Sequence, residues 1–398
     1  MSSPEWQGNN ETYNDAEERR VLLGALSSFY QYAKVAHYNT THLRRQSFYA
    51  LPRAHWELLA QPPFSYLETL DAVDSAIDKN AELAAAILEA GLQSFGLTQP
   101  SNQETIKQDD WRELATPNDL EKARSSLRQF YRDWSEGGRA EREACFGPVM
   151  RALRIERSNR SGSKLRVLVP GAGLGRLVFD LCCDGFDAEG NEISYHQLLA
   201  SSYILNHCPE ARSHTIYPWA HSFSNHKNRA NHLMSVQVPD VNPGVTLGNV
   251  EGAGQMSMSA SDFLLLYSDE DQRDSFDAVA TVFFLDTAPN IIRYIEAIRN
   301  CLKKGGLLVN VGPLLWHFEN NAPGTHGREK DPSHPSGSCG IADPGSVELT
   351  DDEVVALVEK LGFEIELRES GIAAPYIQDP ESMIQNIYQA THWVARKK

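Results

Sequence analysis

The residues whose types and spacing most clearly indicate a binding site form a glycine-rich turn that contains Gly171, Gly173 and Gly175. The turn follows a short apolar run at 165–170 and opens a stretch with helical spacing at 174–183. Glycines let the backbone turn sharply and approach a ligand closely, and the first N–H groups of a helix have no partner within the helix. This context favours a nucleotide-type cofactor over a turn that only packs a strand against a helix.

An acidic residue stands where a ribose-binding carboxylate would be expected. Glu192 closes a second predicted strand at 186–192, about twenty residues beyond the turn, where its carboxylate can accept hydrogen bonds from both ribose hydroxyls. NAD-dependent oxidoreductases and methyltransferases share this feature. The glycine order Gly-x-Gly-x-Gly fits the methyltransferases better than the order Gly-x-Gly-x-x-Gly.

Asp262 and Phe263 extend the predicted cofactor site. The Asp262 carboxylate can accept a hydrogen bond from an adenine amino group while the Phe263 ring stacks on the base. Taken alone, Asp262 could also cap a helix or a turn. The turn, Glu192 and this pair follow one another in the order expected of a cofactor-binding fold, which favours cofactor binding.

An Asp and a His follow the next two predicted strands. Asp286 comes after a buried run at 276–284, and His317 comes after a run at 307–311. Reactive groups of parallel sheets lie beyond the carboxyl ends of the strands, so these two side chains could orient and deprotonate a nitrogen nucleophile. A helix cap for Asp286 and a core-edge histidine for His317 are equally favoured on the sequence alone.

The elements that must position these residues change character along the chain. Apolar residues at three- and four-residue steps predict helices in the first part of the chain. We expect these helices at 15–50, at 66–95, from Pro117 behind a Thr116 N-cap, and at 141–156. From residue 165 onward, short apolar runs alternate with helical stretches, which predicts a parallel sheet with helices on both faces.

The predicted fold class is therefore α/β, with two domains. An N-terminal helical domain is expected at 1–157, and a Rossmann-like class I methyltransferase domain is expected at 158–398. Segments near 221–256 and 320–346 are rich in His, Asn, Gly, Pro or Ser and are expected to be long loops. A turn is expected at 303–306.

Composition limits the classes of function. The 398 residues carry a formal net charge of −16, which argues against a general nucleic-acid binder. The six cysteines form no CxxC pair and the histidines of the two long segments fit solvated loops, so we expect no metal site. We expect neither a signal peptide nor a membrane span, and therefore a cytoplasmic protein; the nucleus and a homodimer are left open.

Longer stretches of the chain resemble the carnosine N-methyltransferase family. The resemblance rests on residues 167–206, 283–290 and 312–320, and on the helical segment 127–142. Its most specific strings are Gln-x-x-Arg-Asp-Trp-Ser and Gly-Pro-Leu-Leu-x-His-Phe-Glu-Asn, and it extends from residue 15 to the end of the chain. The loop after Asn320 is longer than usual and the residues before Tyr388 are poorer in tyrosine, and both differences concern the substrate more than the reaction.

The resemblance implies methyl transfer from S-adenosyl-L-methionine to the imidazole ring of carnosine, a small dipeptide, giving anserine and S-adenosylhomocysteine. It implies that Gln129 and Arg132 of the helical domain reach the cofactor, where a guanidinium suits a carboxylate. Val282 is also expected at the cofactor. The implied substrate-pocket residues are Phe283, Asp286, His317, Tyr376 and Tyr388.

The expected mechanism is an in-line displacement in which the protein aligns an unprotonated imidazole nitrogen with the methyl group. Asp286 or His317 would hold the other ring nitrogen, and Tyr376 and Tyr388 would wall the pocket. Three alternatives stay open: a methyltransferase for another histidine-containing peptide or protein, an NAD-dependent oxidoreductase, and a non-catalytic cofactor-binding module.

Overall fold

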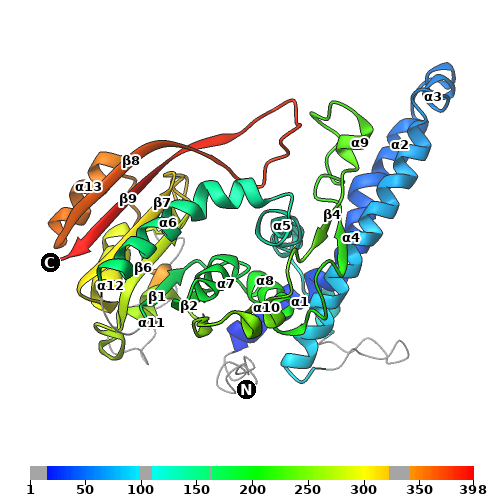
Figure 1. Cartoon of the computed structure of the whole chain (residues 1–398). Helices are drawn as coiled ribbons and strands as arrows, with labels where there is room; N and C mark the ends of the chain where they lie inside the picture. Colours follow the sequence, from blue (N-terminus) through cyan, green and yellow to red (C-terminus); the bar gives the residue numbers. More distant parts are fainter. Residues whose placement is uncertain (1–15, 98–109, 161–163, 322–339) are drawn as a thin grey trace. The chain divides into compact units, whose positions relative to one another are not determined.

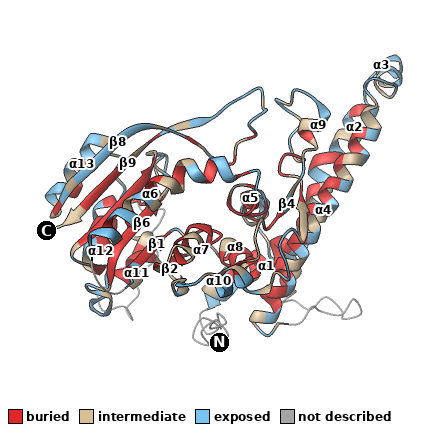
Figure 2. Ribbon diagram, in the orientation of Figure 1, coloured by how far each residue is buried: buried red, intermediate tan, exposed pale blue. Residues whose placement is uncertain are grey.

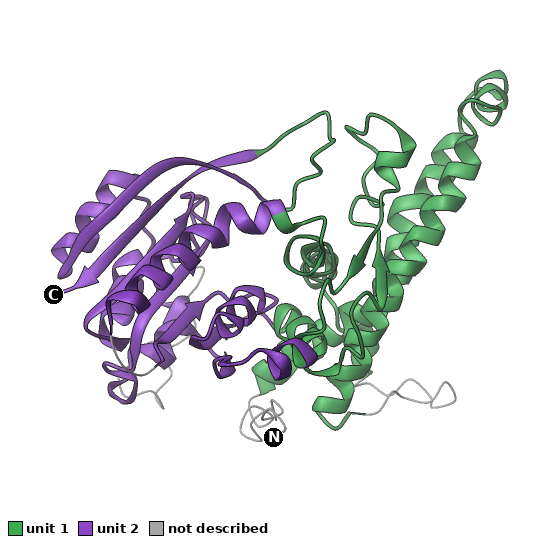
Figure 3. Ribbon diagram, in the orientation of Figure 1, with its two compact units in different colours: residues 1–139, 195–244, 377–386 green, residues 140–194, 245–376, 387–398 purple. Residues whose placement is uncertain are grey.

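The structure is a computed structural model that describes residues 16–97, 110–160, 164–321 and 340–398. The chain divides into two units (Figure 3). Unit 1 comprises residues 1–139, 195–244 and 377–386, and unit 2 comprises residues 140–194, 245–376 and 387–398. Each unit is therefore assembled from segments that lie far apart in the sequence.

Unit 2 is built on a seven-stranded sheet with the order β5-β2-β1-β6-β7-β9-β8. Its strands are β1 (Arg166–Pro170), β2 (Asp187–Glu192), β5 (Met256–Ala260), β6 (Phe276–Val282), β7 (Leu302–Gly312), β8 (Phe363–Pro375) and β9 (Ile387–Lys397). The first five pair in parallel, whereas β9 runs antiparallel to both β7 and β8. Counted along the chain, the strand order is 3-2-1-4-5-7-6, with an antiparallel seventh strand.

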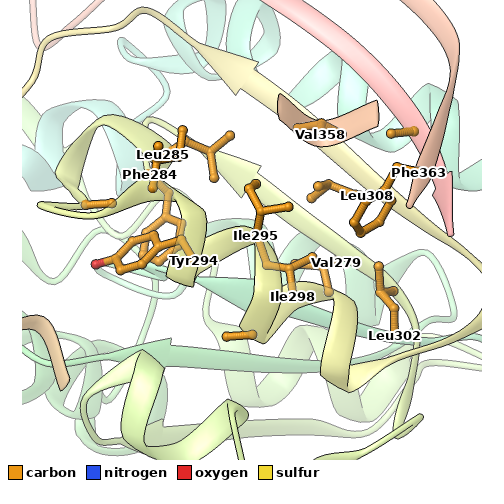
Figure 4. Close-up of a cluster of buried hydrophobic side chains, with 14 of the residues drawn as sticks. Val279, Phe284, Leu285, Tyr294, Ile295, Ile298, Leu302, Leu308, Val358 and Phe363 are labelled. Carbon is orange, nitrogen blue, oxygen red and sulfur yellow. The ribbon is translucent and has the colours of Figure 1, made fainter. Parts of the chain in front are cut away.

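Apolar residues on alternate positions of the central strands bury both faces of this sheet. Leu168, Val279 and Leu308 belong to the cluster formed with α11 (Phe263–Tyr267), α12 (Ile291–Cys301) and α13 (Asp351–Lys360), part of which Figure 4 shows. Their neighbours Val167, Ala278 and Leu307 belong to the cluster formed with α6 (Arg139–Asn159) and α7 (Arg176–Cys183). Successive residues of a strand point to opposite faces of the sheet, and both faces are buried. The strand sequences are therefore continuously hydrophobic.

Unit 1 is mainly helical. Its longest helices, α1 (Ala16–His37) and α4 (Tyr66–Ser94), run side by side (Figure 1), and each has buried and exposed parts along its length (Figure 2). The other helices are the π-helix Tyr38–His42, α2 (Leu43–Tyr49), α3 (Arg53–Leu59), the 3-10 helix Trp111–Glu113, α5 (Pro117–Trp134), α8 (Tyr195–Ser202), the π-helix Tyr203–His207 and α9 (Arg229–His232). A small antiparallel pair, β3 (His214–Ile216) and β4 (Val236–Val238), completes the unit.

The start of α5 follows directly from its sequence. Thr116 accepts a hydrogen bond from the Asp119 backbone N–H, the Asp119 carboxylate accepts one from the Thr116 N–H, and Pro117 occupies the first turn. This reciprocal capping box satisfies two N–H groups that a helix cannot pair by itself. The predicted N-cap is confirmed.

The structure corrects several boundaries. It assigns α6 to unit 2 and the segments 195–244 and 377–386 to unit 1, so the units do not divide at residue 157. The reason is that the described part of unit 1 buries its helices against segments that the chain reaches only later, for example α4 against β3 and α8.

The segment 221–256 is not a continuous loop. It contains α9, β4 and α10 (Pro243–Asn249), and β5 begins at its end. A segment rich in His, Asn, Gly and Pro can still form a short strand when a neighbouring strand pairs with it, as β3 pairs with β4. Of the other predicted loop, residues 322–339 lie outside the described residues, and Gly340–Ala342 forms a 3-10 helix.

Two further differences concern the sheet. The predicted turn at 303–306 lies within β7, next to a register shift in its pairing with β6. The strand β8 was not predicted, because it is largely exposed, carries charged residues in its first half and lacks a clean alternation. The strand β9 was not predicted either. Among the described residues, no helix combines the length and the apolar character needed to cross a membrane.

Candidate active site

The glycine turn joins β1 to α7, as predicted. Gly171, Gly173 and Gly175 all have positive φ angles, of 67°, 58° and 76°, in the region where a Cβ atom is strained. Gly175 is the N-cap residue of α7. The Ala172 N–H donates to the carbonyl oxygen of Asn191 at 2.9 Å, which fixes the turn against the end of β2.

The carboxylate of Glu192, the last residue of β2, is held by three backbone N–H groups. One oxygen accepts from Gly173 at 3.0 Å, and the other accepts from Ile193 and Ser194 at 2.8 Å each. Burial raises the pKa of Glu192, and these hydrogen bonds act in the opposite direction. The glycine turn and the acidic residue predicted for a ribose are thus linked by a direct hydrogen bond.

This arrangement fits an adenosine-type cofactor. The three left-handed glycines alternate with Ala172 and Leu174 along the turn, and the Glu192 carboxylate beside them supplies the acceptor oxygens that ribose hydroxyls require. Asp286 and the other reactive groups leave β6 and β7 at the carboxyl edge of the same sheet. The residues present therefore suit the predicted group.

Asp262 and Phe263 have structural partners. One oxygen of Asp262 accepts from the N–H groups of Leu264 and Leu265 and caps α11, and its other oxygen accepts from Ile341 at 2.8 Å. The Phe263 side chain is 5% exposed and lies in the core that contains α12. Capping and core packing are thus what the described contacts show, and the adenine contacts of these two residues stay predictions.

Three of the predicted substrate residues come together as an aromatic group. The Phe283 ring lies 5.1 Å from that of Tyr376 and 5.8 Å from that of Tyr388, and the two tyrosine rings lie 6.5 Å apart. Phe283 follows β6, Tyr376 follows β8 and Tyr388 lies in β9. The small cluster around Cys145 packs against Phe283 and Tyr388, together with Val282 at the end of β6.

Phe283 has an unusual backbone conformation. Its φ angle is +53°, which is rare for a bulky residue and strained. Its N–H donates to the carbonyl oxygen of Val311 at 2.9 Å, so pairing with β7 holds the residue in place. Strain of this kind concentrates at functional sites, where the surrounding structure enforces it.

Asp286 and the segment of His317 also lie together. Asp286 belongs to the 3-10 helix Leu285–Thr287 and is 3% exposed. Its carboxylate accepts from the Leu315 N–H at 2.9 Å, and its carbonyl oxygen accepts from the His317 N–H at 3.1 Å. Burial raises the pKa of Asp286, while the nearby His317 lowers it. The His317 side chain is exposed.

Gln129 and Arg132 lie on α5 in unit 1 and share one partner. The Gln129 amide donates to Asp133 at 2.9 Å, and the Arg132 guanidinium donates to both Asp133 oxygens, at 2.6 and 3.2 Å. Asp133 is almost fully buried and carries this network. The part of Gln129 and Arg132 in cofactor binding stays a prediction.

Two residues near the predicted cofactor-binding residues, Asp133 and Gly190, had no predicted role. Asp133 orients Gln129 and Arg132, and its position four residues after Gln129 is the signal that could have found it. Gly190 lies in the middle of β2, where an added Cβ atom would lie 2.8 Å from the Cβ atom of Ala172 in the glycine turn. A glycine inside a predicted buried strand indicates such a close backbone approach.

The sheet order with its antiparallel seventh strand, the glycine turn after β1 and the acidic end of β2 define the fold of the class I S-adenosylmethionine-dependent methyltransferases. A family model described as carnosine N-methyltransferase matches residues 109–398. The chain belongs to the carnosine N-methyltransferase family.

Individual relatives agree with this assignment. The chain is 38% identical over 385 residues to the carnosine N-methyltransferase of Schizosaccharomyces pombe, a match that covers 96% of this chain and 97% of the relative. It is 33% identical over 383 residues to the carnosine N-methyltransferase of Mus musculus, with 96% and 86% covered.

Solved structures with which the chain can be aligned include methyltransferases. An S-adenosylmethionine-dependent methyltransferase of Methanosarcina mazei is 17% identical, with 61% of this chain and 96% of that chain covered and a TM-score of 0.36. The magnesium protoporphyrin IX methyltransferase of Synechocystis PCC 6803 with bound S-adenosylhomocysteine is 12% identical, with 69% and 94% covered and a TM-score of 0.38.

Proposed function

We propose that the chain is an S-adenosyl-L-methionine-dependent N-methyltransferase that methylates the imidazole ring of carnosine, giving anserine and S-adenosylhomocysteine. The observation that carries the proposal is the buried Asp286 carboxylate, fixed by the Leu315 N–H at the carboxyl end of β6. Membership in the carnosine N-methyltransferase family supports the choice of substrate.

The bound cofactor supplies an activated methyl group, and the protein aligns the nucleophile with it. The Asp286 carboxylate accepts a hydrogen bond from one imidazole nitrogen, which fixes the tautomer and leaves a lone pair on the other nitrogen. When the ring becomes cationic, the same buried carboxylate stabilises the positive charge. The hydrogen bond from Leu315 keeps Asp286 in one orientation throughout.

The aromatic group of Phe283, Tyr376 and Tyr388 walls the substrate pocket and excludes water from the ring. The tyrosine hydroxyls are the groups that we expect to hydrogen-bond the dipeptide backbone. His317 is the second candidate for the ring nitrogen, because its backbone is tied to Asp286 while its side chain is exposed.

On the cofactor side, Glu192 accepts from the ribose hydroxyls and the glycine turn follows the cofactor closely. We include Gln129, Arg132, Asp262, Phe263 and Val282 as cofactor-binding residues in the proposal. Asp133 would then act through Gln129 and Arg132, since it orients both side chains.

The test is methyl transfer from labelled S-adenosylmethionine to carnosine by the purified protein, with the product identified by mass. We expect Asp286→Asn to lower kcat by at least a hundredfold while the affinity for S-adenosylhomocysteine stays within about twofold, since general acid–base and charge-stabilising groups contribute factors of about this size. The control Glu319→Gln changes an exposed carboxylate in the same exit segment and should retain full activity. An Asp286→Asn protein with normal turnover would exclude the proposed role.

A methyltransferase for another histidine-containing peptide or protein is the main alternative, since the same carboxylate could hold any imidazole. A panel of histidine dipeptides and histidine-containing proteins distinguishes the two. We further propose that the protein acts in the cytoplasm and test the nucleus with a fluorescent fusion. Light scattering after size-exclusion chromatography decides whether it forms a homodimer.

A further inference from the structure

The segment 377–386 joins the two tyrosines of the aromatic group. The pairing of β8 with β9 ends at Pro375 and Ile387, so Tyr388 lies within the paired strands and Tyr376 is the first residue beyond them. The segment belongs to unit 1, whereas both tyrosines belong to unit 2. Tyr376 is 44% exposed, so packing alone holds its ring weakly. Its position therefore depends on how the segment that follows it is held.

The segment begins with a strained residue. Ile377 has a φ angle of +49°, which is rare for a β-branched residue. Its carbonyl oxygen accepts from the Arg128 guanidinium at 2.7 Å, and its side chain is buried. A conformation of this kind persists only where the surrounding structure enforces it. Contacts of unit 1 therefore fix the direction in which the chain leaves Tyr376.

Asp379 organises the rest of the segment. Its Oδ1 atom accepts from the Glu381 N–H at 2.9 Å and from the Asn231 side-chain amide at 3.3 Å. Its carbonyl oxygen accepts from the side-chain amides of Gln378 and Gln385, at 3.0 Å each. The Asp379 side chain is only 7% exposed. This buried residue thus ties the segment together and joins it to α9.

Further bonds hold the segment to the chain just before α9. The Met383 N–H donates to the carbonyl oxygen of Asn225 at 2.8 Å, and the Ser382 hydroxyl donates to the same oxygen at 3.3 Å. The segment is therefore anchored on residues 225–231 through both its main chain and its side chains.

His226 faces the second carboxylate oxygen of Asp379. Its Nε2 atom lies 2.9 Å from the carbonyl oxygen of Ser222, which can only accept, so Nε2 carries the hydrogen. Its Nδ1 atom lies 3.8 Å from Asp379 Oδ2, and neither atom has a hydrogen-bond partner within the described chain. In the neutral ring these are two acceptors. A side-chain amide at position 379 would keep the acceptor Oδ1 and offer an N–H group to Nδ1, whereas alanine would offer neither.

We propose that Asp379 is a positioning residue for the methyl transfer. By anchoring the segment 377–386 on residues 225–231, it holds Tyr376 and Tyr388 in place against Phe283. The consequence for substrate binding rests on the proposed function, since that function gives the aromatic group its role as a pocket wall. The anchoring itself does not depend on the reaction.

Fluorine NMR of the full chain labelled with 3-fluorotyrosine tests the positioning without substrate. The variants Tyr376→Phe and Tyr388→Phe assign the two resonances. We expect Asp379→Ala to shift or broaden both, whereas Asp379→Asn should resemble the parent. The control Glu381→Ala removes an exposed carboxylate that pairs with Lys227 at the surface, and it should leave both resonances in place. If Asp379→Ala does not fold, Asn231→Ala removes a donor to the same Oδ1 atom and should shift the same resonances.

Kinetics with carnosine test the consequence. Asp379→Ala should raise the KM about fivefold with kcat unchanged, because the anchor acts on the pocket wall and leaves Asp286 untouched. The affinity for S-adenosylhomocysteine should also stay unchanged. In the Tyr376→Ala background, Asp379→Ala should raise the KM by less than about a further twofold, since residues that act through one another are not additive.

Unchanged tyrosine resonances in Asp379→Ala, equal effects of Asp379→Ala and Asp379→Asn, or additive effects on the KM would overturn the inference. A parent protein that did not methylate carnosine would instead refute the proposed function. The fluorine spectra would still decide whether Asp379 positions the two tyrosines.

Discussion

Replacement of Gly190 by Ala should damage both the stability of unit 2 and the glycine turn. Gly190 lies in β2, and a Cβ atom built on it would lie 2.5 Å from the sulfur of Met258 in β5. It would also lie 2.8 Å from the Cβ atom of Ala172 and 2.9 Å from a methyl group of Val178. The Met258 side chain can move away, but Ala172 and Val178 are short and belong to the turn and to α7, so those elements must shift.

The magnitude follows from two opposing terms. Overpacking in a filled core costs about 1–3 kcal/mol, whereas exchanging glycine for alanine within an element recovers about 0.5–1 kcal/mol of chain entropy. The expected net loss is about 1–2 kcal/mol, which corresponds to a fall in Tm of about 2–8 °C for a unit of this size. Because Ala172 must move, we also expect at least tenfold weaker binding of S-adenosylhomocysteine.

Differential scanning calorimetry and titration calorimetry measure the two effects. The matched control is Gly248→Ala, because a Cβ atom at Gly248 in α10 would have nothing within 4 Å. That variant should be as stable as the parent or gain up to about 1 kcal/mol. If Gly190→Ala and Gly248→Ala showed the same Tm and the same affinity for S-adenosylhomocysteine, neither stability nor cofactor binding would depend on the close approach of β2 to the glycine turn.

Three further predictions concern local features. Thr116→Ala removes the cap of α5 and should lower the free energy of unfolding by about 1 kcal/mol, measured in urea against the parent. The pKa of His37 is raised, since its hydrogen bonds to Asp74 and Asp78 outweigh the opposing effect of burial. The stabilising contribution of His37 should therefore be complete below the unfolded pKa of about 6.5 and be lost as the pH rises through the folded pKa. In His37→Gln, the free energy of unfolding should depend less on pH across this range. An unchanged pH dependence would contradict the pairing of His37 with the two carboxylates. Phe283→Ala removes two aromatic contacts of about 0.5–1.5 kcal/mol each and should raise the KM for carnosine several-fold, with unchanged binding of S-adenosylhomocysteine as the control.

Elements governed by local rules could be predicted from the sequence. The N-cap at Thr116, the apolar stripe of α4 and the buried strands β1, β2 and β6 follow from capping chemistry and from the periodicity of the apolar residues. The position of Glu192 beside the glycine turn also followed, because the ends of adjacent parallel strands meet at one edge of the sheet.

Other features depend on contacts between distant segments. The edge strand β8 is mostly exposed, so its residues carry little of the alternation from which strands are inferred. His232 was expected in a solvated loop but is fully buried, stacked on His226 and next to Phe223. Phe223 and His226 lie nine and six residues before His232 in the same segment, but the spacing of these residues follows neither a helix nor a strand period, so the sequence did not indicate that they pack together.

The sequence by itself determined the class of fold, the glycine turn, the acidic end of β2 and the family. These features reside in short strings whose backbone geometry depends on near neighbours. Only the tertiary structure decided that Phe283, Tyr376 and Tyr388 form one aromatic group, that Asp262 and Phe263 serve capping and packing, and that residues 377–386 belong to unit 1. The physical reason is that burial and pairing depend on tertiary contacts between residues distant in the sequence, and a single sequence does not show which residues form those contacts.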